Sequence, residues 1–238
     1  MPFKILSPLN NKQAFWFKHI SPALIFAIFM LTIYSKVQWD ISLTNLFFDA
    51  QQQVFPLKRH EFLSQWMHVD LKWLMVAIAL TSFGLSAASY QFSHLKVHRK
   101  SLLWVFVGMV VATTAVSILK HYNQHGCPWD IAMYGGDLPL FELFATPPAG
   151  VEAGRCFPAG HPSGGFALMA LYFSFMHSKP RFANKMLWLG LAMGLLMGMA
   201  QVMRGAHFLS HVLWSGWVVW VVLLLLYRIW PPNKALLT

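Results

Sequence analysis

Six apolar stretches close to the length of a membrane span divide the sequence, and they limit the fold more than any other feature. They lie at residues 20–37, 71–92, 102–120, 161–177, 186–203 and 208–227. An α-helix of roughly 20 apolar residues crosses the hydrocarbon core of a bilayer, and a shorter one can cross with flanking anchors. The sequence therefore predicts an all-α membrane protein, a bundle of six transmembrane helices in a single membrane domain, 1–238.

The composition favours burial in lipid over burial in a soluble core. Hydrophobic residues make up 57% of the chain and charged residues only 11%, against about 25% charged in typical soluble proteins. In a soluble protein the formal charge of +10 would suggest nucleic acid, but here the basic residues form short clusters between apolar runs. We therefore expect contact with anionic lipid headgroups and no nucleic-acid binding.

The basic residues also predict the orientation in the membrane. Of the 18 lysines and arginines, 11 fall in or beside short loops on one side: Lys4, Lys12, Lys18, Lys96, Arg99, Lys100, Lys179, Arg181, Lys185, Arg228 and Lys234. Because such loops stay cytoplasmic, we expect both termini inside a cytoplasmic (inner) membrane, with an uncleaved first helix. Loops 38–70, 121–160 and 204–207 would face the periplasm or exterior, with 38–70 along the outer interface.

Three polar clusters fall on this outer side, at the ends of predicted helices. They span 120–130, 154–165 and 204–211. Lys120 and Arg204 supply positive charge, and a helix beginning near His161 would add free N–H groups. His207 and His211 are four apart and would share a face if helical. Ionisable groups at membrane depth are costly and commonly functional, so the clusters predict an anion site, best matched by a phosphoryl group.

The two cysteines, Cys127 and Cys156, both lie in the outward loop 121–160. An oxidising compartment permits a bridge between them. We predict a disulfide that closes a loop of about 30 residues and contributes roughly 2–4 kcal/mol to stability. It would tie the first polar cluster to the second. The alternative is a pair of unreactive free thiols.

Taken in order, the polar clusters resemble the motifs of the type 2 phosphatidic acid phosphatase (PAP2) superfamily of membrane lipid phosphatases. The family pattern is K-x6-R-P, then P-S-G-H, then S-R-x5-H-x3-D. This chain reads K-x6-C-P from Lys120, P-A-G-H up to His161, and A-Q-x5-H-x3-H up to His211. The resemblance covers the third to sixth predicted helices, with its motifs within 120–211, and agrees with a six-helix topology.

The resemblance implies a role for each matching residue. His207 would attack phosphorus and form a phosphohistidine, while His161 would protonate the leaving oxygen and then activate water. Lys120 would bind the phosphate oxygens and stabilise charge in the transition state. Gly160, beside His161, would let a backbone N–H group approach the phosphate closely. The pattern implies no metal and no other cofactor. Taken alone, His207 and His211 could instead form a zinc-binding pair.

Several positions depart from the family pattern. The family arginines are replaced by Cys127 and Gln201, the serine of the second motif by Ala159, and the final aspartate by His211. We expect Arg155 and Arg204 to supply the missing phosphate-binding charge from shifted positions. Either the site works in this altered form, or its activity is weak or lost.

The family aspartate at the position of His211 would orient the ring of the nucleophilic histidine and set its tautomer. His211 would accept a proton from the His207 ring and so orient it, although a neutral imidazole stabilises an imidazolium less than a carboxylate does. Asp130 or Asp137 is an alternative source of the missing carboxylate.

The predicted function is hydrolysis of a terminal phosphate or pyrophosphate of a membrane lipid at the outer leaflet. Candidate substrates are undecaprenyl pyrophosphate, phosphatidylglycerol phosphate, phosphatidic acid and the lipid A phosphates. Two alternatives stay open: phosphotransfer from His207 to a lipid acceptor, and a non-catalytic lipid-binding or transport protein of the same fold. The sequence leaves the oligomeric state open, a homo-oligomer included.

Overall fold

The structure, a computed structural model, describes residues 11–151 and 153–232. Eight α-helices make up most of this part of the chain: α1 (Asn11–Thr32), α2 (Trp39–Asn45), α3 (Leu71–Ala88), α4 (Arg99–His121), α5 (Gly160–Phe166), α6 (Met169–Phe175), α7 (Pro180–Met203) and α8 (Leu209–Ile229). Shorter helical pieces connect them: η1 (Tyr34–Lys36), the π-helix η2 (Phe62–Asp70), η3 (Ser93–His98), η4 (Pro128–Asp130) and η5 (Ala132–Tyr134). No extended strand occurs in these ranges, which confirms the all-α prediction.

Five helical segments of the described chain are long and apolar enough to cross a membrane: 13–36, 62–88, 93–121, 180–203 and 209–229. They match five of the six predicted runs. The second of them includes η2, so the last nine residues of the segment 38–70 continue directly into α3. The predicted count of six long helices is not confirmed, because the fourth run folds differently.

The fourth predicted run, 161–177, forms α5 and α6, which are seven residues each. Between them the backbone tightens to i→i−3 hydrogen bonds, in which Leu168 N–H donates to Gly165 and Ala170 N–H donates to Ala167. Glycines at 160, 164 and 165 lower the helix propensity of this run, which favours such a tight turn over a regular helix. Hydropathy alone could not distinguish this broken segment from a continuous span.

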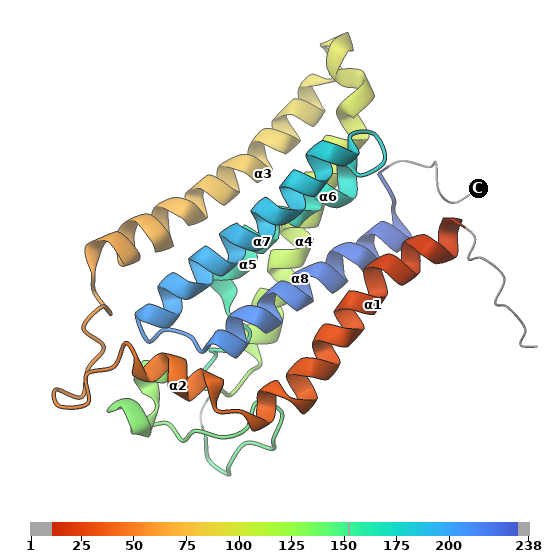
Figure 1. Ribbon diagram of the computed structural model, residues 1–238. Coiled ribbons are helices and arrows are strands. Elements are labelled where there is room, and N and C mark those ends of the chain that lie inside the picture. Colours follow the sequence, from red (N-terminus) through yellow and green to blue (C-terminus); the bar gives the residue numbers. More distant parts are fainter. Residues whose placement is uncertain (1–10, 152, 233–238) are drawn as a thin grey trace, which may run out of the picture.

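The α5–α6 pair nevertheless joins the two ends of the bundle. At one end Ala159 N–H donates to the carbonyl of His211, in the first turn of α8. At the other end the hydroxyl of Ser174 donates to the carbonyl of Ser101, in the first turn of α4. The pair lies in the middle of the bundle among α4, α7 and α8 (Figure 1), and its buried side chains form much of the core.

The packing of α5 against α7 depends on small residues. A Cβ atom on Gly165 would lie 2.7 Å from the backbone nitrogen of Gly194, which is closer than any real contact. Two glycines thus let the helix backbones touch, the usual way in which membrane helices approach closely. This contact fixes α5, and with it His161 in the first turn of α5.

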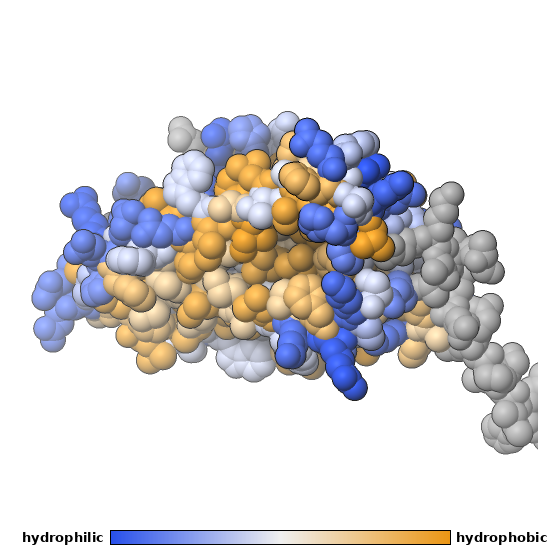
Figure 2. Space-filling view, turned by 90° about the horizontal axis from the view of Figure 1, so that it is seen from above, coloured by the Kyte–Doolittle hydropathy of each residue, from blue (hydrophilic) through white to orange (hydrophobic). Residues whose placement is uncertain are grey.

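The outer faces of the long helices are apolar. Exposed large hydrophobic residues occur along α1, α3 and α7, including Ile25, Ile28, Leu80, Trp188 and Leu196. Figure 2 shows hydrophobic residues across the middle of one face and hydrophilic residues gathered mainly toward its two ends. Such a belt matches a bilayer around the bundle, so the chain is a multi-pass membrane protein.

One end of the bundle holds the start of α1 and the end of α8 (Figure 1). The indole of Trp104 donates to the carbonyl of Trp230, which joins the start of α4 to this end.

Of the basic residues predicted for the cytoplasmic side, Lys4 and Lys234 lie outside the described residues. The opposite end holds α2, the long loop and the turn between α7 and α8. There Ser210 N–H donates to Asp40 of α2 at 2.8 Å.

Candidate active site

The long loop is closed at its base by the predicted disulfide. Cys127 and Cys156 are bonded, with their Cα atoms 5.2 Å apart, so the alternative of free thiols is wrong. Backbone hydrogen bonds reinforce the closure, as Arg155 N–H donates to Asn123 and Cys156 N–H donates to His125, both at 3.0 Å. The second polar cluster is therefore held against the first, directly beyond the end of α4.

His207 lies in the turn between α7 and α8. The turn depends on Gly205, whose φ of 74° is left-handed and whose missing Cβ leaves room for the ring of Phe55, 2.5 Å from where that atom would be. The carbonyl of Gly205 accepts a hydrogen bond from Trp129 N–H at 3.0 Å. The turn is thereby locked to the long loop, and the His207 side chain is buried.

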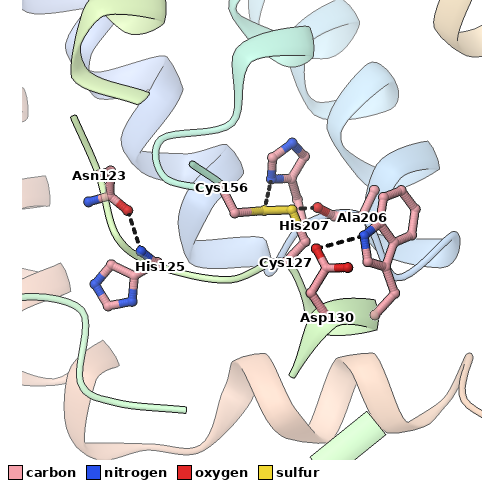
Figure 3. Close-up of a disulfide and its surroundings, with 8 residues drawn as sticks. Asn123, His125, Cys127, Asp130, Cys156, Ala206 and His207 are labelled. Carbon is pink, nitrogen blue, oxygen red and sulfur yellow. Dashed lines mark hydrogen bonds between the residues drawn. A yellow bond between two sulfur atoms is a disulfide. The ribbon is translucent and has the colours of Figure 1, made fainter. Parts of the chain in front are cut away.

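The disulfide sets the tautomer of His207. Nδ1 of His207 lies 3.2 Å from Sγ of Cys156 (Figure 3). A disulfide sulfur carries no proton and is only a weak acceptor, so Nδ1 must be the protonated nitrogen of this contact. Nε2 then keeps its lone pair and points away from the disulfide (Figure 3).

The electrostatic surroundings of His207 keep its ring neutral. Burial lowers the pKa of His207 well below its usual value, and the neighbouring His211 and Lys120 lower that pKa further. A neutral ring with a free Nε2 lone pair is the form that a nucleophile requires.

His161 faces the same region from the first turn of α5. Its Nε2 lies 3.0 Å from the carbonyl oxygen of Met67. Because a carbonyl can only accept, Nε2–H is the donor, and Nδ1 is the nitrogen left for proton exchange. The ring packs against that of His68, with the two centroids 4.1 Å apart.

A cavity of about 650 Å³ brings most of the predicted site residues together. Five of the predicted residues line it: Lys120, Arg155, Gly160, His161 and His207. No acidic residue of the described chain lines it. A Cβ on Gly160 would lie 3.5 Å from Cδ of Lys120, so the bare backbone of α5 lies beside the lysine. The cavity therefore combines positive charge with His161 and His207, each of which leaves one ring nitrogen without a protein partner.

The rest of the cavity is apolar and runs between α3 and α4. Its walls include Met75, Ala79 and Leu80 of α3, and Phe106 and Met109 of α4. The cavity follows α4 from Lys120 to Phe106, which is roughly 20 Å at 1.5 Å per residue. A polar head with a long apolar extension suits an amphiphilic ligand.

Two predicted residues do not line the cavity. The rings of His211 and His207 are 5.9 Å apart between centroids, and Nδ1 of His211 is buried without a partner. Arg204 donates through Nε to the carbonyl of Lys58 at 3.0 Å and through Nη1 to Oε1 of Gln201 at 3.2 Å. The position predicted for His211, beside Nδ1 of His207, is occupied by Sγ of Cys156.

Neither suggested carboxylate lines the cavity either. One carboxylate oxygen of Asp130 accepts a hydrogen bond from the indole of Trp129 at 3.0 Å (Figure 3). Asp137 is also absent from the cavity wall.

Two further residues of the cavity were missed from the sequence. Gln201 is 2% exposed, and its Nε2 has no partner. The orientation of its amide is fixed, since the guanidinium of Arg204 can only donate and must therefore face Oε1. His68 also lines the cavity, with a buried Nδ1 that has no partner. The family pattern marks Gln201 only as a lost arginine, and no motif marks His68.

One group of potential metal ligands lies at the disulfide. Within the described ranges, three ligand-type side chains approach within 4.8 Å of one another: Cys127, Cys156 and His207. Two of the three are joined as a disulfide, which offers no thiolate. This donor set does not fit a metal ion.

Comparison with known proteins identifies one family. The model of the PAP2 superfamily matches residues 101–235, which is more than half of the chain. The matched part begins at the third residue of α4, extends past the end of α8, and includes all five predicted residues that line the cavity. No curated protein and no solved structure gives a significant match.

Proposed function

The chain belongs to the PAP2 superfamily, and from this premise we propose that it is a membrane phosphatase that removes a terminal phosphate from a lipid. The observation that carries the proposal is the meeting of His207, His161 and Lys120 in one cavity that continues into an apolar groove. A phosphate would bind at the polar end, and the lipid tail would lie between α3 and α4.

The first step would form a phosphohistidine. Nε2 of His207 attacks phosphorus as the bond to the lipid oxygen breaks. That oxygen takes a proton from Nδ1 of His161, which enters this step as the imidazolium, with both ring nitrogens protonated. The Nδ1–H of His207 faces Cys156 throughout, so the lone pair of Nε2 is the one that reacts. The released lipid carries a hydroxyl group, or its own phosphate if the substrate was a diphosphate.

The second step would regenerate both histidines. Nδ1 of the neutral His161 accepts a proton from water, and the resulting hydroxide displaces Nε2 of His207 from phosphorus. Inorganic phosphate leaves, and His161 is again protonated for the next cycle. Lys120 and Arg155 would offset the negative charge of the phosphoryl oxygens in both transition states.

The proposed location follows from the loops. We place the cavity at the outer face of a cytoplasmic membrane, with both termini inside, since the basic clusters favour this orientation. The disulfide supports an oxidising compartment on the cavity side. A lipid could then enter sideways from the outer leaflet without leaving the bilayer.

The test is phosphate release by the purified protein in detergent, with lipid diphosphates, phosphatidylglycerol phosphate, phosphatidic acid and lipid A phosphates as substrates. We expect release from at least one substrate, and loss of that release in His207→Ala and His161→Ala. His94→Ala, an exposed histidine in η3, is the matched control and should retain full activity. No release, or equal release by all variants, would favour a non-catalytic lipid-binding protein.

A further inference from the structure

One wall of the cavity comes from the part of the chain before residue 101, outside the family match. It carries His68, at the end of η2, and Lys72, in the first turn of α3. The two are four residues apart along a continuous helical segment, a spacing that places side chains on one face. Neither takes part in the two steps proposed above.

One ring nitrogen of His68 lacks a hydrogen-bond partner that a ligand would supply. Its Nδ1 is buried and has no hydrogen-bond partner among the described residues, although the ring lines the cavity. A buried polar atom without a partner destabilises a fold, and a ligand that supplies the partner accounts for its presence. η2 is a π-helix, a form that occurs often at functional sites.

The charges that line the cavity exceed what one phosphate needs. Lys72, Lys120 and Arg155 all line it, and no acidic residue of the described chain does so. A phosphate monoester carries a charge of about −1.5 to −2 near neutral pH. If Lys120 and Arg155 bind the scissile phosphate, Lys72 remains without a counter-charge.

The wall formed by His68 and Lys72 lies where the leaving group of the substrate would be. The ring of His68 packs on the ring of His161, 4.1 Å away between centroids. In the proposed reaction His161 protonates the leaving oxygen, so a side chain stacked on it lies on the leaving-group side of phosphorus.

We propose that His68 and Lys72 form a subsite for an anionic phosphate carried by the leaving group. This inference rests on the proposed function and deepens it by naming a substrate class. The preferred substrate is a lipid in which a second phosphate follows the scissile one. A lipid diphosphate and a lipid with a phosphodiester next to its terminal phosphate both have this chemistry. Phosphatidic acid, whose leaving group is neutral, does not.

The experiment compares substrates that differ only in the leaving group. The full-length protein in detergent is assayed with a prenyl diphosphate against the same prenyl monophosphate, and with phosphatidylglycerol phosphate against phosphatidic acid of the same acyl chains. The pair with the larger difference identifies which source of the second phosphate is used. We expect kcat/KM to be at least about tenfold higher with the second phosphate, the value of one charge-assisted hydrogen bond.

Two variants test the residues. Lys72→Met and His68→Leu should lower kcat/KM for the two-phosphate substrate about tenfold, mainly through KM, and leave the one-phosphate substrate within about twofold. Lys36→Met, an exposed lysine of η1, is the control and should change neither. Inorganic pyrophosphate should inhibit the wild type more strongly than phosphate does, and Lys72→Met should remove that difference.

Other outcomes would overturn the inference. These are no preference of the wild type for the second phosphate, equal losses on both substrates in the variants, or no loss in either variant. The proposed function fails separately, if release persists in His207→Ala. Lys72 is exposed, so its replacement keeps the test valid even if His68→Leu does not fold.

Discussion

Buried histidines occur at both ends of the bundle, and they differ in their hydrogen bonds. Near the end where α1 begins, both ring nitrogens of His19 have partners at 2.7 Å, the carbonyl of Phe15 and the hydroxyl of Tyr172. At the opposite end His207 uses Nδ1 against the disulfide and leaves Nε2 toward the cavity. His161 uses Nε2 on a carbonyl and leaves Nδ1. A histidine with both nitrogens bonded is structural, whereas a free nitrogen in a polar cavity is available for chemistry.

The largest difference between these ends should appear in catalysis. His161→Asn is expected to lower kcat on a natural lipid phosphate by about 10²- to 10⁴-fold, the usual contribution of a general acid. A substrate analogue with an aryl leaving group needs little protonation and should recover most of the first-step rate. Burst kinetics with both substrates would measure this, and an equal loss on both would argue against the proton-donor role.

The disulfide should affect both stability and activity. The double variant Cys127→Ser, Cys156→Ser is expected to lower the free energy of unfolding by about 2–4 kcal/mol. It should also reduce activity, because the bridge sets the position and tautomer of His207. Thermal unfolding in detergent with and without reductant would show the effect. Full activity in the double variant would mean that another group orients His207.

Replacing His19, at the opposite end of the bundle, should lower stability without changing activity. His19→Phe leaves the buried hydroxyl of Tyr172 without its partner, at a cost of about 1–3 kcal/mol. Activity per folded molecule should stay unchanged, since His19 lies away from the cavity of His207. If His19→Phe lost activity without losing stability, the distinction drawn between the two ends would be wrong.

The smallest effect concerns pH. Burial lowers the pKa of His207 and of His125, so each binds fewer protons in the folded than in the unfolded protein. Stability is then fully present above the unfolded value of 6.5 and decreases as the pH falls below it, by at most about 1.4 kcal/mol per pH unit for each histidine. Unfolding in detergent at pH 8, 7, 6 and 5 should show this decrease, and His125→Phe should weaken it. A pH-independent stability would contradict the burial of these rings.

Much of the site could be predicted from the sequence, because it depends on the order of the motifs along the chain and on the side of the membrane that each loop faces. The disulfide followed from two cysteines in one outward loop, and the motif order indicated that Lys120, His161 and His207 belong to one site. The place of His211 could not be predicted from its spacing. α8 begins at Leu209, so His207 lies before the helix and the four-residue spacing does not put both rings on one face.

Other features depend on tertiary contacts that no motif records. The run 161–177 is apolar enough to predict a lipid-facing span, but hydropathy does not distinguish burial in lipid from burial among helices. His68 reaches the site only because η2 packs beside α5, as its neighbour Met67 shows by accepting the hydrogen bond of His161. The orientation of the Gln201 amide is set by its hydrogen bond from Arg204, a contact that no motif records.

The most direct test of the proposed mechanism is to trap the phosphorylated enzyme. The purified protein would be mixed with lipid labelled in its terminal phosphate, quenched in alkali within milliseconds to seconds, and digested for mass spectrometry. The proposal predicts an acid-labile, alkali-stable phosphate on the peptide that contains His207, absent from His207→Ala. Phosphate release without any such adduct, or an adduct on another residue, would contradict it.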